Sequence, residues 1–336
     1  MEIIERGPYL QHIESLLGKG GVVVLTGHRR SGKSCLLESL AGRLAPKGNV
    51  IYLDMENPDH ADIRSYEDLH SHILTKVDQV QNNYLLIDEV QEIVQFEKTL
   101  RYWAKQDRMN VVVTGSNATM LSSEISTTFA GRYVRIHISS LDYAEFLQFH
   151  AREDNIDSLS SYLRWGGLPF LRNIPEGDTR IRMEYLGSIY DTIFVKDIVA
   201  RKQIRNVSFL NNLARFIADN TGKVISANSI ANYMKHLGIS VSTNTVADYI
   251  GSLCDTYMID RVGRFDISGK RIFDQQEKYY FEDIGIRNYL CKDKRATDLE
   301  KVLENIVYLK LKNSGYAVYV GQLNGKEIDF VATKGE

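Results

Sequence analysis

The residues best suited to chemistry lie in one short segment, Gly27-His28-Arg29-Arg30-Ser31-Gly32-Lys33-Ser34. Its two glycines allow a tight turn in which successive main-chain N–H groups point into one concavity that binds anions. The Lys33 ammonium can reach the β- and γ-phosphates of a nucleotide, and the Ser34 hydroxyl can bind Mg²⁺. The spacing therefore predicts a phosphate loop that binds a nucleotide.

The flanking residues predict the elements that must hold this loop. The run from Gly21 to Thr26 is typical of a buried strand, and the run from Cys35 to Leu44 is typical of a helix with leucines along one face. The loop would then lie at the electropositive N-terminus of that helix, where phosphate is stabilised. A plain glycine turn between a strand and a helix is the alternative interpretation.

Apolar runs alternate with helical stretches through residues 1–150, which predicts an α/β domain with a parallel sheet covered on both faces. One of these runs ends in Asp88 and Glu89. Because ligands bind at the carboxyl ends of parallel strands, we expect Asp88 to hold Mg²⁺ and Glu89 to orient the attacking water. The alternative is a solvated strand end. The predicted strands are Val22–Leu25, Val50–Leu53, Tyr84–Ile87, Val111–Thr114 and Tyr133–Ile138.

Three more residues are candidates for the reaction. Ser116 or Asn117, after the fourth run, could hydrogen-bond the γ-phosphate or the lytic water, although both residue types also favour helix caps and turns. Arg132, just before the fifth run, could stabilise transition-state charge in its own subunit or across an interface. A surface ion pair is the alternative interpretation for Arg132.

The nucleotide is expected to be ATP. The segment Thr75-Lys76-Val77-Asp78 is similar to the guanine-reading motif of GTPases, but it precedes Asp88, whereas in GTPases that motif follows the aspartate that binds Mg²⁺. We expect it to be a solvated helical face within a helix from His70 to Val80.

The chain resembles AAA-type ATPases of the additional-strand class, through ERGPYL, LTGHRRSGKS, LLIDEVQ, VVVTGSNA and FAGRYVRIHISSLDYAEFL. It is most similar to a bacterial and archaeal group with a winged-helix segment and a nuclease-like C-terminal domain. The resemblance implies sheet order 5-1-4-3-2, with the sensor strand between the strand of Glu89 and that of the phosphate loop. It also implies that the nucleotide contacts Gly27 through Cys35 and that Arg6 and Tyr9 pack against adenine.

The rest of the chain is predicted to form three segments. Residues 151–205 would be a helical lid, including a long helix from Ile181 to Lys202, and residues 206–290 a winged helix. No Lys or Arg lies between Leu237 and Asp260, so its recognition helix lacks the cations that drive DNA binding. We therefore expect protein or interdomain contact. The basic hairpin, with Arg261, Arg264, Lys270 and Arg271, leaves DNA contact open.

Residues 291–336 are expected to form part of a nuclease-like module. Glu304 on a helix and Asp329 on a strand resemble the opening of the PD-(D/E)XK nuclease core. That chemistry also needs a Glu-x-Lys or Gln-x-Lys strand after the aspartate, which completes a metal site and a base. No such strand precedes Glu336, so we expect an inactive remnant, or a nuclease if the natural chain is longer.

Composition limits the class of protein. The chain has 336 residues, 43% of them hydrophobic and 25% charged, and a formal net charge of −2, which indicates two or three globular domains. No apolar run approaches the roughly 18 residues that span a membrane. The three cysteines (Cys35, Cys254 and Cys291) have no metal-ligand spacing, which suits the cytoplasm.

The sequence as a whole predicts a Mg²⁺-dependent ATPase in which hydrolysis rearranges the C-terminal modules. A DNA-associated regulator that uses ATP as a switch is the alternative. A monomer, a dimer and a ring all stay open.

Overall fold

A computed structural model describes residues 4–115, 132–200, 202–204, 206–236, 238–266, 271–292, 298–324 and 326–334. Contacts within the chain divide it into two compact units, Met1–Ile138 and Ser139–Glu336. This division is coarser than the four predicted segments, whose boundaries at 150, 205 and 290 stay a prediction.

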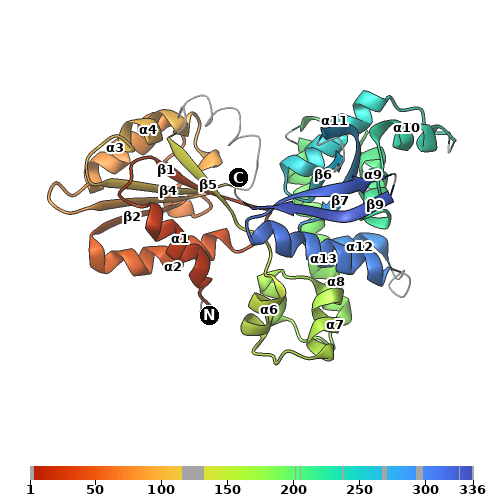
Figure 1. The fold of residues 1–336 in the computed structure, drawn as a ribbon. Coiled ribbons are helices and arrows are strands. Elements are labelled where there is room, and N and C mark those ends of the chain that lie inside the picture. The colour runs from red at the N-terminus through yellow and green to blue at the C-terminus, as the bar shows by residue number, and fades with distance from the viewer. Residues whose placement is uncertain are drawn as a thin grey trace. The chain divides into compact units, whose positions relative to one another are not determined.

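The first unit is built on a five-stranded sheet of order β2-β3-β4-β1-β5 (Figure 1). Every neighbouring pair is parallel, and Val22 of β1 lies between Val111 of β4 and Tyr133 of β5. Read from the other edge, this is the order 5-1-4-3-2 that the resemblance implied, so that prediction is confirmed. The strands are β1 (Val22–Thr26), β2 (Asn49–Asp54), β3 (Asn83–Asp88), β4 (Met109–Gly115) and β5 (Tyr133–His137).

Helices cover both faces of this sheet. Alternate side chains of a strand point to opposite faces, so Val22 and Val24 contribute to one core and Val23 and Leu25 to the other. Helices α1 (Gly7–Leu16) and α2 (Lys33–Leu44) bury their apolar sides in the core of Val23 and Leu25. Helices α3 (Tyr66–Lys76) and α4 (Phe96–Trp103) do so on the opposite face (Figure 1).

The GTPase-like segment is only partly helical. Helix α3 ends at Lys76, and the Asp78 carboxylate accepts the main-chain N–H groups of Val80 at 2.7 Å and Gln81 at 2.9 Å. A short acidic side chain that bonds main-chain groups just ahead of it favours a turn over a continuing helix. The prediction of a helix to Val80 is therefore wrong by one turn.

The second unit contains most of the helices that the structure describes. A predicted helix from Ile181 to Lys202 is divided, because α8 is followed by π-helical residues Ile193–Ala200. The π-helical turn buries Ile193, Phe194, Asp197 and Ile198. The helices are α6 (Tyr143–His150), α7 (Ile156–Trp165), α8 (Thr179–Thr192), α9 (Val207–Asp219), α10 (Ala227–His236), α11 (Thr243–Asp255), α12 (Ile284–Cys291) and α13 (Leu299–Asn313).

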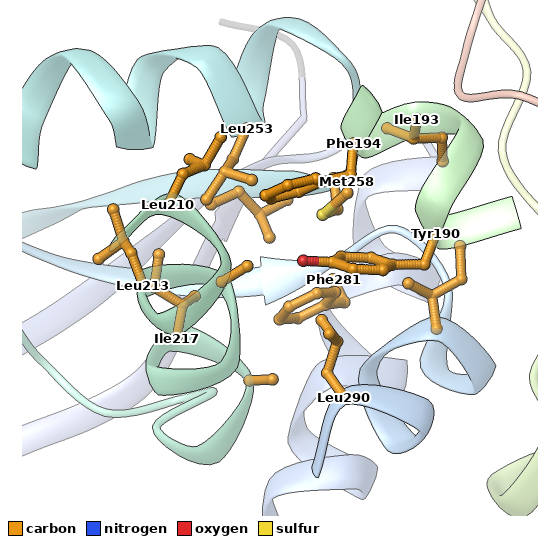
Figure 2. Close-up of a cluster of buried hydrophobic side chains, with 14 of the residues drawn as sticks. Tyr190, Ile193, Phe194, Leu210, Leu213, Ile217, Leu253, Met258, Phe281 and Leu290 are labelled. Atoms are coloured by element: carbon orange, nitrogen blue, oxygen red, sulfur yellow. The ribbon is translucent and has the colours of Figure 1, made fainter. Parts of the chain in front are cut away.

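One apolar core joins the middle of this unit (Figure 2). Tyr190 and Phe194, on either side of the start of the π-helical turn, point into the same cluster as Leu213 of α9 and Phe281. These side chains are each at most 5% exposed, so they lose their contact with water almost completely on folding. The segments predicted as a helical lid and as a winged helix therefore share one core.

A second sheet has the order β7-β6-β8-β9. Strand β6 pairs antiparallel with β7 and parallel with β8, and β8 pairs antiparallel with β9. The hairpin predicted as a wing is thus hydrogen-bonded to the C-terminal strands, although its tip, 267–270, lies outside the described residues. The strands are β6 (Ile259–Asp266), β7 (Arg271–Phe281), β8 (Ala317–Leu323) and β9 (Lys326–Thr333).

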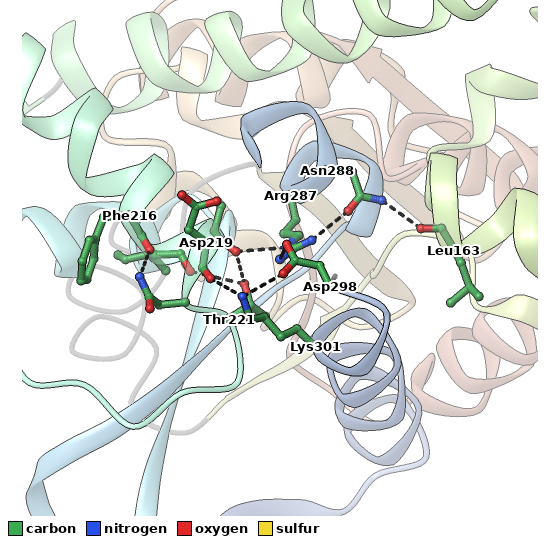
Figure 3. A network of polar contacts seen from close by, with 11 residues as sticks. Leu163, Phe216, Asp219, Thr221, Arg287, Asn288, Asp298 and Lys301 are labelled. Atoms are coloured by element: carbon green, nitrogen blue, oxygen red, sulfur yellow. Dashed lines mark hydrogen bonds and ion pairs between the residues drawn. The ribbon is translucent and has the colours of Figure 1, made fainter. Parts of the chain in front are cut away.

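A buried polar network ties the helices of the second unit together (Figure 3). Arg287 of α12, 1% exposed, donates to the Ala218 carbonyl at 3.0 Å and to Asp298 at 2.8 Å. Lys301 of α13 bonds Asp298 at 2.9 Å and the Asp219 carbonyl at 2.6 Å. Burial alone would raise the pKa of Asp298, but the hydrogen bonds from Lys301 and Arg287 lower it below its usual value.

Across the described part of the chain, every helix is too short or too polar to span a lipid bilayer.

Candidate nucleotide site

The phosphate loop joins β1 to α2, as the sequence predicts. Gly27 has φ +145° and Gly32 has φ +96°, values that disfavour any side chain. A Cβ on Gly27 would lie 2.2 Å from the Ile138 carbonyl oxygen, so no other residue fits there. Because α2 begins at Lys33, its free N–H groups lie at the end of the loop, where they favour bound anions.

The loop's polar groups suit a phosphate ligand. Lys33 is 4% exposed, and its Nζ donates to the Gly27 and His28 carbonyls, each at 2.9 Å. The buried hydroxyls of Thr26 and Ser31 have no hydrogen-bond partner among the described residues. A buried ammonium beside an unsatisfied buried hydroxyl is the donor set that phosphate oxygens would satisfy.

Ser34 and Asp88, the predicted metal ligands, are brought together. The Ser34 side chain hydrogen-bonds Asp88, and Thr114 Oγ1 donates to Asp88 Oδ1 at 2.5 Å. Asp88 is 3% exposed, and burial raises the pKa of its carboxyl while the bonds from Thr114 and Ser34 oppose that shift. A carboxylate and a hydroxyl at this edge are hard oxygen ligands suited to Mg²⁺.

Glu89 follows directly, in an unusual backbone conformation. Its φ of +52° is left-handed, which costs a non-glycine residue about 1–2 kcal/mol. The Glu89 N–H donates to Thr114 Oγ1 at 2.9 Å, and Gln91 Nε2 donates to Glu89 Oε2. The first bond fixes the Glu89 main chain next to Asp88 at the carboxyl end of β3, and the second fixes its carboxylate.

Thr114 and Gln91 were missed in the sequence as site residues. Thr114 is 0% exposed and bonds both Asp88 and the Glu89 main chain. The sequence did contain a signal for Thr114, namely a threonine at the end of the apolar β4 run. The implied sheet order places β4 beside β3, so this side chain would lie near Asp88. Gln91 carried no spacing signal, since its contact depends on the left-handed turn at Glu89.

Arg6 and Tyr9, which the resemblance linked to adenine, lie close to the loop. Arg6 is 6% exposed, its Nη1 donates to the Ser31 carbonyl at 3.2 Å, and its guanidinium lies 4.5 Å from the centre of the Tyr9 ring. The pair therefore presents a cation stacked on an aromatic ring beside the phosphate loop. This arrangement suits a planar base.

The remaining loop residues have different environments. His28 is 1% exposed, and its Nδ1 lies 2.6 Å from the Arg29 carbonyl oxygen. Arg29 forms a 3.9 Å ion pair with Glu56. Arg30 has φ +63°, and Cys35 is exposed in the first turn of α2.

The remaining candidates for the reaction are Ser116, Asn117 and Arg132. Ser116 and Asn117 lie outside the described residues. Arg132 is exposed at the start of β5, where its carbonyl accepts the Val22 N–H at 3.0 Å. The phosphate loop begins at Gly27, five residues after Val22 and beyond the opposite end of β1. At roughly 3.3 Å per residue, the loop lies about 16 Å along the strand from Val22. This placement contradicts a role for Arg132 in its own subunit, and a role across an interface stays a prediction.

The basic hairpin has mixed surroundings. Arg261 lies 3.6 Å from the Glu277 carboxylate, and Arg264 bonds Gln276. A carboxylate beside an arginine reduces its attraction for phosphate. DNA contact by this hairpin stays a prediction.

Two family models match separate parts of the chain. The AAA domain family matches residues 19–147, and a domain of unknown function (DUF8612) matches residues 156–297. An uncharacterized protein of Haemophilus influenzae is 32% identical over 347 residues, covering 99% of this chain and 85% of that protein. An uncharacterized protein of Methanocaldococcus jannaschii is 26% identical, covering 98% and 76%.

A solved structure shares the fold. The Walker-type ATPase of Pyrococcus abyssi has a TM-score of 0.61 at 15% identity, covering 85% of this chain and 95% of that protein.

The AAA domain, the strand order and the phosphate loop define an AAA-type P-loop ATPase. Because its identity to the Haemophilus influenzae protein extends over nearly the whole chain, this chain belongs to the same family as that protein.

Proposed function

We propose that this protein is a Mg²⁺-dependent ATPase in which hydrolysis at the phosphate loop is coupled to the second unit. The observation that carries the proposal is that Ser34 and the buried Thr114 hydroxyl both hydrogen-bond the Asp88 carboxylate, while the same Thr114 hydroxyl accepts the main-chain N–H of Glu89. A metal-ligand pair beside a separate carboxylate provides both parts that phosphoryl transfer to water needs, namely charge neutralisation and an oriented nucleophile.

Each residue has a distinct role in the proposal. Lys33 and the first N–H groups of α2 bind the phosphates, and Ser34 with Asp88 would hold Mg²⁺. The metal ion supplies charge neutralisation on the phosphate oxygens when it is bound. Glu89 accepts a hydrogen bond from the attacking water and fixes its direction. Arg6 and Tyr9 form one wall for the adenine.

The covalent connection between the units supports coupling. Ile138, the last residue of the first unit, donates to the Thr26 carbonyl at 2.7 Å, and its own carbonyl faces Gly27. The next residue, Ser139, belongs to the second unit and donates to Asn313 of α13 at 2.8 Å. A change in the loop at Gly27 therefore acts directly on the residue that precedes the second unit.

The test compares three substitutions by phosphate release and nucleotide binding. We expect Lys33→Ala to lose ATP binding, because it removes the buried ammonium. Glu89→Gln should keep ATP binding and lose turnover by about 100-fold or more, since it removes the base and retains the shape. Glu92→Gln, an exposed carboxylate three residues further on, is the matched control and should turn over like the unsubstituted protein.

Removing the metal tests the Mg²⁺ requirement in the same assay. Excess EDTA should abolish phosphate release, and added Mg²⁺ should restore it. Phosphate release by Glu89→Gln at the unsubstituted rate would refute the role given to Glu89, and full activity in EDTA would refute the metal.

A further inference from the structure

A buried lysine in the second unit is surrounded by carboxylates. Lys278 of β7 is 1% exposed, and its Nζ lies 2.8 Å from Glu304 Oε1. The same nitrogen lies 2.8 Å from Glu327 Oε1 and 3.5 Å from Asp329 Oδ1. Two of these acids, Glu304 and Asp329, are the residues that resemble a nuclease core.

The fold brings these acids to the lysine from two elements. Glu327 and Asp329 are two residues apart on β9, so their side chains share one face of the strand. Glu304 lies in the middle of α13, which packs against β7, β8 and β9. We call Lys278, Glu304, Glu327 and Asp329 the Lys278 cluster.

The Glu304 carboxylate is fixed on two sides. Tyr280, which is 0% exposed and stacked on Tyr308, donates its hydroxyl to Glu304 Oε1 at 2.6 Å. On the other side is Gly222, at φ +76°, where a Cβ would lie 2.8 Å from Glu304 Oε2. The carboxylate therefore has little freedom to turn away from Lys278.

The geometry of the Lys278 cluster suits an ammonium better than a metal ion. Mg²⁺ needs oxygen ligands at about 2.1 Å in octahedral arrangement, whereas an ammonium donates three hydrogen bonds. No group of three or more Asp, Glu, His or Cys residues with metal-binding geometry occurs in the described ranges. Lys278 Nζ is itself within 3.5 Å of all three carboxylates, so the ammonium lies at the point where they converge.

Lys278 stays charged in this environment. Burial alone would lower its pKa, but hydrogen bonds to Glu304 and Glu327 outweigh that effect and raise the pKa above its usual value. A lysine held protonated balances negative charge, and it cannot accept a proton as a general base.

We propose that Lys278 is the built-in cation of this cluster, occupying the position that a divalent metal would need among Glu304, Glu327 and Asp329. The nuclease-like part of the second unit is then an ion-paired structural element that requires no metal. This inference does not depend on the ATPase activity of the first unit.

The experiment measures Mn²⁺ binding to the full chain without nucleotide, by electron paramagnetic resonance. All proteins carry Asp88→Asn, which removes the metal ligand of the phosphate loop. With Lys278 in place we expect no bound Mn²⁺. Lys278→Met should gain one Mn²⁺ per chain, and its melting temperature should rise on adding Mn²⁺. The gain should vanish in Lys278→Met with Glu304→Gln, and Lys278→Arg, which keeps the charge, should bind none.

Two results would overturn the proposal. One is Mn²⁺ bound in the presence of Lys278 and lost on Glu304→Gln, which would show that a metal displaces the lysine. The other is a folded Lys278→Met protein, checked by circular dichroism, that binds no Mn²⁺. Should Lys278→Met not fold, the titrations with Lys278 and with Lys278→Arg decide the question alone, because Glu304-dependent Mn²⁺ binding by either protein refutes it.

Discussion

At the scale of single residues, one hydroxyl bonds two of the candidate site residues at the loop edge of the sheet. Thr114 Oγ1 donates to Asp88 and accepts the N–H of Glu89, so it fixes the proposed metal ligand and the proposed water-activating residue together. Without that acceptor the buried Glu89 N–H would lose its partner, which costs about 1–3 kcal/mol. We propose that Thr114 positions Asp88 and Glu89 for reaction.

We predict that Thr114→Val lowers turnover at least tenfold while ATP affinity changes little. Valine keeps the shape and removes both hydrogen bonds. Thr99→Val is the matched control, because Thr99 is also a buried threonine, 2% exposed, that donates to the Tyr66 carbonyl at 2.6 Å away from the loop. Urea unfolding should show a stability loss of about 1–3 kcal/mol for Thr114→Val, which loses two hydrogen bonds, and about 1 kcal/mol for Thr99→Val, which loses one. Equal turnover in the two variants would contradict the role of Thr114.

Spacing alone was enough to predict part of this site. Lys33 and Ser34 follow from the glycine pattern, and Asp88 follows from its position after an apolar strand. Thr114 could not be assigned without the strand order, because its partners lie 25 and 26 residues away. Arg132 was misplaced for its own subunit because proximity in sequence to a strand does not say at which end of the sheet a residue lies.

At the scale of elements, α6 contains a histidine that is held neutral. The His150 ring lies 4.2 Å from that of Phe146 in the last turn of α6. The pKa of His150 is lowered to about 4, mainly by burial of the ring and then by the positive charges of Arg182 and Arg152. A positive charge on His150 is therefore disfavoured only in the folded state.

We predict that this histidine makes the second unit sensitive to acid. Between pH 6.5 and about 4 the unfolded chain binds the proton that folded His150 does not, so stability is lost as the pH falls through that window. The loss should be roughly 2 kcal/mol, allowing for partial exposure of the ring. His150→Phe should remove it, while His12→Phe, at an exposed position on α1, should not.

Urea unfolding of the three proteins at pH 7 and pH 5 measures this difference. An identical change in stability between the two pH values for His150→Phe and the unsubstituted protein would show that His150 does not contribute.

Most elements were predictable because their apolar spacing is regular. The β1–β5 runs and α2 match the predictions closely, since continuous or 3.6-residue patterns reflect burial directly. The π-helical residues Ile193–Ala200 were not predictable, because a π-turn differs from an α-turn only in hydrogen-bond pairing. The pairing of β6 with β8 was also not predicted, because the identity of a strand's neighbour in a sheet leaves no pattern in the local sequence.

At the scale of the whole molecule, an AAA-type ATPase unit is followed by a second unit with its own cores. The buried network around Arg287 and the Lys278 cluster each contain residues from both 206–290 and 291–336. These two segments therefore fold together within the second unit. The resemblance to a winged-helix module and a nuclease-like module stays a prediction. It did not show that β6 and β8 would be neighbours in one sheet.

The central claim is that the loop around Lys33 binds ATP with Mg²⁺, and isothermal titration calorimetry of the full chain tests it most directly. We predict one site per chain with a Kd between about 1 μM and 1 mM, the range of typical enzyme substrates. Lys33→Ala should give no binding heat. Saturable binding that is unchanged by Lys33→Ala, or no binding by the unsubstituted chain, would contradict the account.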